Sequence, residues 1–274
     1  MTAHVSIPPL GLAHFTALEV PPLELVGLAA RIGFASIGLR LVAAAPGTPA
    51  YALRAGSPEV AELRHRLHDN GVRVHDLEIV TIGEHFDPQA LEPVLDAGSE
   101  IGASRLSVCA DDPDRARLVD RFAALCDLAA RYAIGVDLEW MGWRTVRTLE
   151  DALDVVTRAG RPGAAILVDA LHLKRNGGSP ADVARVPPGL IRSVQLCDAR
   201  AEAPVGTEAI IAEARGGRLP PGEGALPLAA LLAAIPADAN LSLEVPMGAT
   251  VPAEERLRRV HAAAVALLES RHAG

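Results

Sequence analysis

The chain has 274 residues, with 26 Lys and Arg against 34 Asp and Glu, so its formal net charge is −8 at neutral pH. A negative chain with scattered Arg residues lacks the basic surface that binding to a phosphate backbone requires, so we expect no nucleic-acid partner. No stretch approaches the ~18 apolar residues of a membrane span, and the N-terminus resembles no secretion signal. With three widely separated cysteines, Cys109, Cys126 and Cys197, these features predict a cytoplasmic protein without a membrane partner.

Short β-type runs alternate with longer helical segments along the chain. Eight mostly apolar runs, typical of strands buried on both faces, fall at 10–14, 36–41, 72–79, 105–109, 134–140, 165–169, 191–196 and 241–245. Apolar residues at three- and four-residue intervals predict helices at 23–32, 58–70, 88–101, 114–132, 149–159, 181–186, 207–214, 226–234 and 253–270. Several helices are expected to end at a glycine before the next strand: Gly33, Gly71, Gly102, Gly135 and Gly160.

The number of repeats predicts the fold class. Eight strand–helix units in 274 residues average about 34 residues each, a usual size for one βα unit. No linker divides the chain, and no Gly-x-Gly-x-x-Gly follows the first strand to mark a dinucleotide site. We therefore predict an α/β protein with one domain, a single (β/α)8 TIM barrel over residues 1–274. The segment 198–224 is either a lid over the site or an ordinary surface insertion.

Polar residues close four consecutive strands that are otherwise apolar. Glu139 and Asp169 end the fifth and sixth predicted strands, Gln195 lies in the seventh, and Glu244 lies near the end of the eighth. Because the carboxyl ends of barrel strands meet at one face, we expect these side chains to converge. Clustered carboxylates repel one another unless a divalent cation balances them, and an all-oxygen set suits Mn²⁺ or Mg²⁺ best, with Co²⁺ or Zn²⁺ next. Any one of these carboxylates could instead cap a helix, as Asp169 is placed to do.

Further polar and aromatic residues are expected at the same face. His172 follows Asp169 by three residues and is a candidate acid or base near neutral pH, or a partner that orients Asp169. The other candidates for substrate contact are His14, Arg40, Glu78, Trp143 and Arg200. Arg215 and Arg218 could clamp an anionic group, although long Arg side chains in a loop are usually solvated.

These residues carry a resemblance to a known family. The matching pieces are Val-Asp-Leu-Glu at 136–139, Leu-Val-Asp-Ala-Leu-His at 167–172, Val-Gln-Leu-Cys-Asp at 194–198, Pro-Gly-Glu-Gly at 221–224 and Leu-Glu-Val-Pro at 243–246. Over nearly its whole length the chain resembles the sugar phosphate isomerase/epimerase superfamily, the xylose-isomerase-like TIM barrels. The resemblance implies that Glu139, Asp169, Gln195 and Glu244 bind one divalent metal ion. Many ketose epimerases carry His at the third ligand, whereas Gln is shared with inosose isomerase-like and 3-dehydroshikimate dehydratase-like relatives.

The expected activity is that of a metal-dependent isomerase or epimerase acting on a small polyhydroxylated ketone, sugar-like or inosose-like. Glu139 and Glu244 would move protons through a metal-stabilised enediolate, with His172 as a further catalytic group.

Two alternatives stay open. In a lyase of the 3-dehydroshikimate dehydratase type the same enolate loses a β-hydroxyl group against His172 as the acid, and Gln195 favours this reading. Alternatively, the barrel binds a sugar-like ligand without catalysis or is one subunit of a heteromeric enzyme. Apolar helix segments at 226–235 and 262–268 are compatible with a homodimer and also with burial against the barrel.

Overall fold

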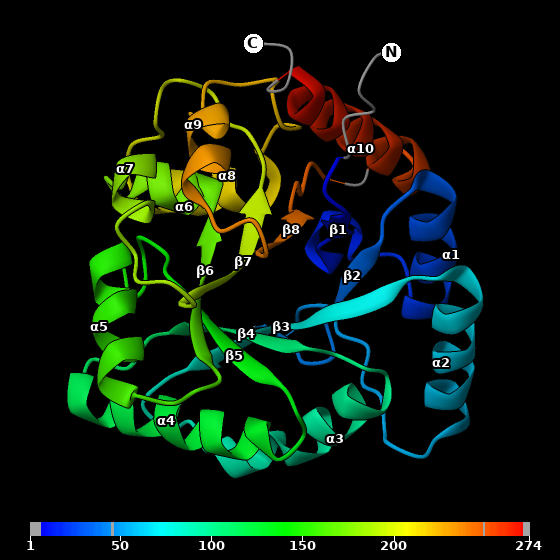
Figure 1. Cartoon of the computed structure of the whole chain (residues 1–274), viewed down its shortest axis with the longest axis vertical. Coiled ribbons are helices and arrows are strands. Elements are labelled where there is room, and N and C mark those ends of the chain that lie inside the picture. Colours follow the sequence, from blue (N-terminus) through cyan, green and yellow to red (C-terminus); the bar gives the residue numbers. More distant parts are fainter. Residues whose placement is uncertain (1–6, 45–46, 249, 271–274) are drawn as a thin grey trace.

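A computed structural model describes residues 7–44, 47–248 and 250–270 of the chain. Eight parallel strands pair in chain order and β8 pairs with β1, so the sheet closes into a barrel surrounded by helices (Figure 1). The predicted (β/α)8 fold is therefore confirmed. Within the described ranges, no helix is long and apolar enough to cross a membrane.

The strands are β1 (Leu10–Leu12), β2 (Ser36–Leu39), β3 (Arg73–Ile82), β4 (Arg105–Ala110), β5 (Gly135–Glu139), β6 (Ala164–Asp169), β7 (Ile191–Leu196) and β8 (Asn240–Leu243). The α-helices are α1 (Pro22–Ile32), α2 (Pro58–Asn70), α3 (Glu92–Glu100), α4 (Arg115–Ala130), α5 (Leu149–Ala159), α6 (Ala170–Arg175), α7 (Pro180–Val183), α8 (Thr207–Gly216), α9 (Leu228–Ala234) and α10 (Ala253–Ser270). Two 3₁₀ helices, η1 (His14–Ala17) and η2 (Pro88–Leu91), complete the described elements. The apolar core lies between strands and helices, where Ile37, Leu106 and Phe122 are fully buried.

Several element boundaries differ from the prediction by a few residues, and three differences affect residues of the barrel mouth. The first predicted strand ended at His14, but β1 ends at Leu12, because Thr16 Oγ1 donates to Leu243 O at 2.9 Å and bends the chain into η1. The third predicted strand ended at residue 79, whereas β3 continues to Ile82 past a register irregularity that begins at Leu77. Helix α6 was not predicted, because it is only six residues long and follows β6 without a loop.

Glycines end the helices at most of the expected positions. The left-handed backbone conformation, which favours glycine, occurs at Gly33 (φ 110°), Gly71 (φ 63°), Gly102 (φ 75°) and Gly160 (φ 60°). The prediction is wrong for Gly135, which begins β5; Ala133 takes positive φ (57°) at the end of the preceding helical segment. Gly135 instead makes room for Arg105, whose guanidinium a Cβ atom at this position would strike.

A buried polar network fills the barrel interior below the mouth. Ser107 Oγ donates to Asp76 Oδ2 at 2.7 Å, and Ser193 Oγ donates to Asp137 Oδ2 at 2.6 Å. Arg105 forms an ion pair with Asp137. These groups satisfy one another in the interior, so the polar side chains at the carboxyl ends of the strands form a separate cluster above them.

Candidate active site

Four polar side chains end neighbouring strands on one half of the barrel mouth. Glu139 is the last residue of β5 and Asp169 the last of β6, while Gln195 lies in β7 opposite Asp169. Glu244 follows β8 directly. All four are buried, with exposed fractions of 3% for Glu139, 0% for Asp169, 3% for Gln195 and 7% for Glu244. The structure therefore brings together the four residues that the sequence pattern singled out as metal ligands.

His172 joins this group from the first turn of α6. Asp169 is the N-cap of α6, and its Oδ1 accepts the backbone N–H of His172 at 2.9 Å. This cap places His172 Nε2 3.7 Å from Glu139 Oε1, and ligand atoms of Glu139, Asp169 and His172 all lie within 4.8 Å of one another. Asp169 is therefore both a helix cap and a member of the polar cluster.

Two buried oxygen atoms of the cluster are left open. Gln195 Nε2 donates to Glu244 Oε1 at 3.1 Å, which orients the amide so that its Oε1 points away from this bond. Among the residues that the structure describes, neither Gln195 Oε1 nor Glu139 Oε1 has a hydrogen-bond partner. Buried acceptors without donors are costly, and oxygen atoms of this kind are the ligands that a divalent cation takes.

Arg218 is a member of the cluster that the sequence pattern did not single out as a central residue. Its side chain is only 2% exposed, with Nη1 2.5 Å from Asp169 Oδ2 and Nη2 2.9 Å from Glu244 Oε2. Arg218 lies 23 positions after Gln195 in the chain, beyond helix α8, so no strand periodicity points to it. The segment 198–224 is thus more than a surface insertion, because its end enters the site.

Electrostatics favour a further positive charge in the cluster. Burial, together with the neighbouring Asp169 and Glu78 carboxylates, raises the pKa of Glu244 to about 7 despite the nearby Arg218. Burial and the Glu244 and Asp169 charges raise the pKa of Glu139 well above its usual value. Burial lowers the pKa of His172 to about 4, so its imidazole is neutral at neutral pH. These carboxylates outnumber the buried guanidiniums of the site, and the donor set fits a divalent cation.

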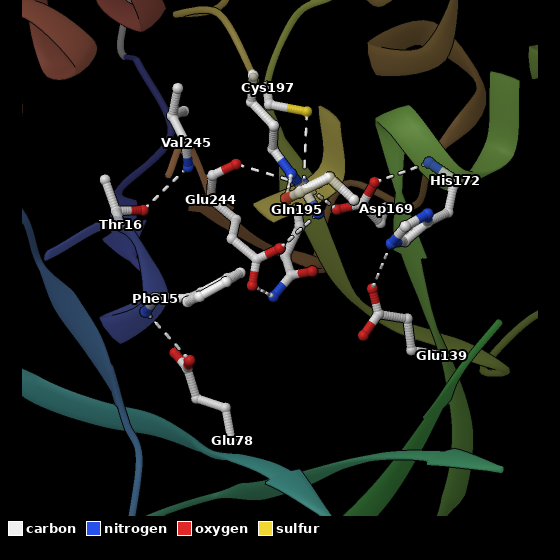
Figure 2. Close-up of polar contacts among 12 residues, drawn as sticks. Phe15, Thr16, Glu78, Glu139, Asp169, His172, Gln195, Cys197, Glu244 and Val245 are labelled. Carbon is white, nitrogen blue, oxygen red and sulfur yellow. Dashed lines mark hydrogen bonds and ion pairs between the residues drawn. The ribbon is translucent and has the colours of Figure 1, made fainter. Parts of the chain in front are cut away.

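The opposite wall is built around Glu78. Its Oε1 accepts His14 N–H at 2.5 Å, and its Oε2 accepts Phe15 N–H at 3.2 Å and Arg40 Nη2 at 3.1 Å. The Arg40 guanidinium lies 4.7 Å from the centre of the Phe15 ring. Figure 2 shows Glu78 and Phe15 on the opposite side of the site from Glu139 and His172. The predicted strand at 72–79 would place Glu78 next to its carboxyl end, whereas in the structure Glu78 lies inside the longer β3.

Of the other expected substrate contacts, Trp143 lines the cavity, whereas His14 and Arg200 do not. Trp143 lines the cavity at the mouth and meets His172 edge-on, with ring centres 5.2 Å apart. His14 is fully buried and uses both ring nitrogens, with Nδ1 accepting Arg40 N–H at 3.0 Å and Nε2 bonding to Val20 O at 2.9 Å. It is absent from the residues that line the cavity, as is the exposed Arg200. His14 therefore supports the wall rather than facing the cavity.

The cavity itself has a volume of about 190 Å³. Its floor is formed by the carboxylates of Glu78, Glu139 and Glu244 with His172 and Gln195. The lining also includes the apolar side chains of Phe15, Ile79 and Met141 and the basic side chains of Arg144 and Arg215. A small molecule with a polar, oxygen-rich edge and an apolar ring or chain matches this lining.

Comparisons with known proteins agree with this geometry. The family model described as xylose isomerase-like TIM barrel matches residues 26–265, so the chain belongs to this family, within the sugar phosphate isomerase/epimerase superfamily. A curated 3-dehydroshikimate dehydratase from Pseudomonas aeruginosa is 31% identical over 163 residues. That match covers 56% of this chain and only 25% of the length of the Pseudomonas protein.

Solved structures show the same fold at lower identity. The IOLI protein with a binding zinc atom superimposes with a TM-score of 0.77 at 18% identity, covering 96% of this chain and 99% of that one. The 3-keto-D-glucoside 4-epimerase YcjR from E. coli superimposes with a TM-score of 0.71 at 19% identity, covering 96% of this chain and 100% of that one. These two structures, one of them an epimerase, thus share the barrel fold of this chain.

Proposed function

We propose that the protein is a metal-dependent enzyme that removes a proton next to the carbonyl of a small hydroxy-ketone and then expels the β-hydroxyl group as water. The reaction is of the 3-dehydroshikimate dehydratase type. The observation that carries the proposal is the position of His172 Nε2, 3.7 Å from Glu139 Oε1, on one side of a buried, oxygen-lined cavity. The dehydratase relative, which matches more than half of this chain, supports the same choice.

One divalent cation would be held by Glu139, Asp169, Gln195 and Glu244. The open oxygens of Glu139 and Gln195 support this assignment, as does the excess of buried carboxylates. Oxygen ligands favour Mn²⁺ or Mg²⁺, with Co²⁺ or Zn²⁺ next. When bound, such an ion supplies electrophilic stabilisation of the negative charge that develops on the substrate oxygen.

His172 would move the proton. Its neutral imidazole takes the proton from the carbon next to the carbonyl, and the electron pair of that C–H bond forms the enolate. The imidazolium that results is stabilised by the Glu139 carboxylate, 3.7 Å away. It then returns the proton to the β-hydroxyl as the C–O bond breaks, so one water molecule leaves and His172 is restored.

The contacts of the remaining carboxylates favour water loss over epimerisation. An epimerase that inverts a carbon centre needs a second proton-transfer group on the opposite face of the substrate. Glu78 and Glu244 lie on the other sides of the cavity, but both oxygens of each accept hydrogen bonds or ion pairs. Isomerisation or epimerisation of a sugar-like or inosose-like ketone is the second candidate, since these two glutamates also line the cavity.

The test is an assay of the full chain, treated with chelator and reconstituted with Mn²⁺. Loss of water from 3-dehydroshikimate gives an aromatic dihydroxybenzoate, which is followed by its ultraviolet absorbance. Ketohexoses and inososes are incubated in D₂O in parallel and analysed for deuterium at carbon. Aromatic product that requires both Mn²⁺ and His172 supports the proposal, whereas deuterium exchange into a ketose without water loss would assign the protein to the epimerases.

A further inference from the structure

Arg218 is fixed between two carboxylates of the site by three contacts besides the ion pairs. Its Nε donates to Ala214 O at 2.9 Å, and its Nη1 donates to Glu244 O at 3.3 Å and lies 3.5 Å from Cys197 Sγ. With Nη1 also at Asp169 Oδ2 and Nη2 at Glu244 Oε2, the guanidinium bridges two of the four proposed ligands. A planar guanidinium that binds two carboxylates holds them in one arrangement more firmly than a single ammonium group would.

The backbone next to Arg218 is held independently of these carboxylates. Leu219 pairs with Asp198 in an antiparallel bridge, with N–O distances of 2.7 and 2.8 Å. The Asp198 side chain accepts the N–H groups of Gly222 at 3.0 Å and Leu226 at 2.8 Å. The end of the segment that follows β7 is therefore pinned to the barrel, and Arg218 enters the site from a defined position.

A guanidinium between two carboxylates balances the same charges that a divalent cation balances. We propose that Arg218 is a positioning residue, a built-in counter-cation that holds Asp169 and Glu244 in place before a metal ion binds and that limits how tightly the ion is then held. The proposal rests on the metal site of the proposed function. Among the described residues, Arg218 makes no hydrogen bond to Glu139 Oε1 or Gln195 Oε1, so the lone pairs of these two oxygens are left for the metal ion.

Two variants of the full chain test this role. Arg218→Gln removes the positive charge, and Arg218→Lys keeps the charge but replaces the planar guanidinium with a single ammonium group. In chelator, Arg218→Gln should lower Tm by about 6 °C or more, because two buried carboxylates lose their partner. Titration calorimetry should show that Arg218→Gln binds Mn²⁺ at least about tenfold more tightly than wild type, because the Arg218 guanidinium no longer competes with the metal ion for the carboxylates. Saturating Mn²⁺ should consequently raise the Tm of Arg218→Gln by more than it raises the Tm of wild type.

Arg175→Gln is the matched control. Arg175 forms a largely buried pair with Glu213, at 2.8 and 2.7 Å, and has no ion pair or hydrogen bond to the proposed ligands. Its loss should lower Tm without changing the Kd for Mn²⁺. Arg218→Lys should bind Mn²⁺ with an affinity close to that of wild type, because it keeps the positive charge.

The outcomes separate the two proposals. If wild type binds Mn²⁺ and the Kd of Arg218→Gln is unchanged or weaker, Arg218 is a structural or orienting residue and the counter-cation role is overturned. If Arg218→Gln does not fold, Arg218→Lys decides, since a charge-based role requires it to fold and to keep the wild-type Kd. If wild type itself binds no Mn²⁺, the metal site of the proposed function falls, and the counter-cation role falls with it.

Discussion

His172 Nε2 lies 3.7 Å from Glu139 Oε1, and the residue that puts it there is Asp169, the cap of the helix on which His172 lies. A single carboxylate thus orients the imidazole through the backbone with one oxygen, while its second oxygen pairs with Arg218. Asp169 therefore affects both proton transfer by His172 and the charge of the metal-ligand cluster, so moving it would disturb both.

The first prediction concerns the role of His172. Replacing it with Gln should lower kcat for the proposed water loss by about 10²- to 10⁴-fold, because the proton-transfer group is gone. The Kd for Mn²⁺ should change less than tenfold, because four oxygen ligands remain. Steady-state kinetics and calorimetric titration of the same preparation check both values. A collapse of Mn²⁺ binding would instead make His172 a ligand and contradict its catalytic assignment.

The second prediction concerns pH and His75, which lies in the barrel interior with Nε2 2.8 Å from Ser193 Oγ. Burial lowers its pKa to about 4, partly offset by Asp137, whereas an unfolded His titrates near 6.5. Between these pH values the unfolded chain binds the extra proton, so His75 makes the folded state progressively less stable as pH falls from about 6.5 to 4. The full contribution is about 3 kcal/mol.

The measurement is the free energy of unfolding as a function of pH for wild type and His75→Gln. The difference between the two proteins should be constant above about pH 7 and should shift in favour of the variant as the pH falls to 4. Parallel curves over the whole range would contradict the lowered pKa of the partly buried His75.

The third prediction concerns Gly38, which lies in β2 beside the Glu78 wall. A Cβ atom there would lie 2.8 Å from Asp76 Oδ1 and would also strike Glu78 Oε1. Gly38→Ala should therefore lower the free energy of unfolding by about 1–3 kcal/mol and displace Glu78.

Gly27→Ala in α1 is the control for that substitution. Its Cβ atom meets only the mobile end of Arg31, at 3.3 Å, so the change should be neutral or raise stability by up to about 1 kcal/mol. Denaturant unfolding compares the two variants, and equal stabilities would show that Gly38 is not needed to accommodate the Glu78 wall.

The fold and half of the site could be predicted from the sequence for one physical reason. Parallel strands buried on both faces are continuously apolar, so a polar residue such as Glu139 or Asp169 at the end of an apolar run stands out. Chain order then equals spatial order in a closed barrel, which predicts that the ends of β5 to β8 converge.

The other half of the site depends on tertiary contacts that leave no periodic signal. Arg218 reaches the cluster because Leu219 bridges to Asp198, a pairing between residues of irregular segments. The position of Glu78 depends on the extension of β3 to Ile82. The alternation of apolar and polar residues along this segment does not predict that extension. His14 ends an apolar run and was expected to face the substrate, but the bend at η1 turns it towards Val20.

The central claim is that a divalent metal ion binds at the carboxyl ends of β5 to β8. Elemental analysis of wild type and Glu244→Ala, purified identically without chelator, tests it most directly, with Glu213→Gln as a control carboxylate outside the cluster. We predict about one equivalent of Mn, Mg, Co or Zn in wild type and in the control, and little in Glu244→Ala. Wild type that holds no divalent ion even after ions are added back, or equal metal in Glu244→Ala, would contradict the account.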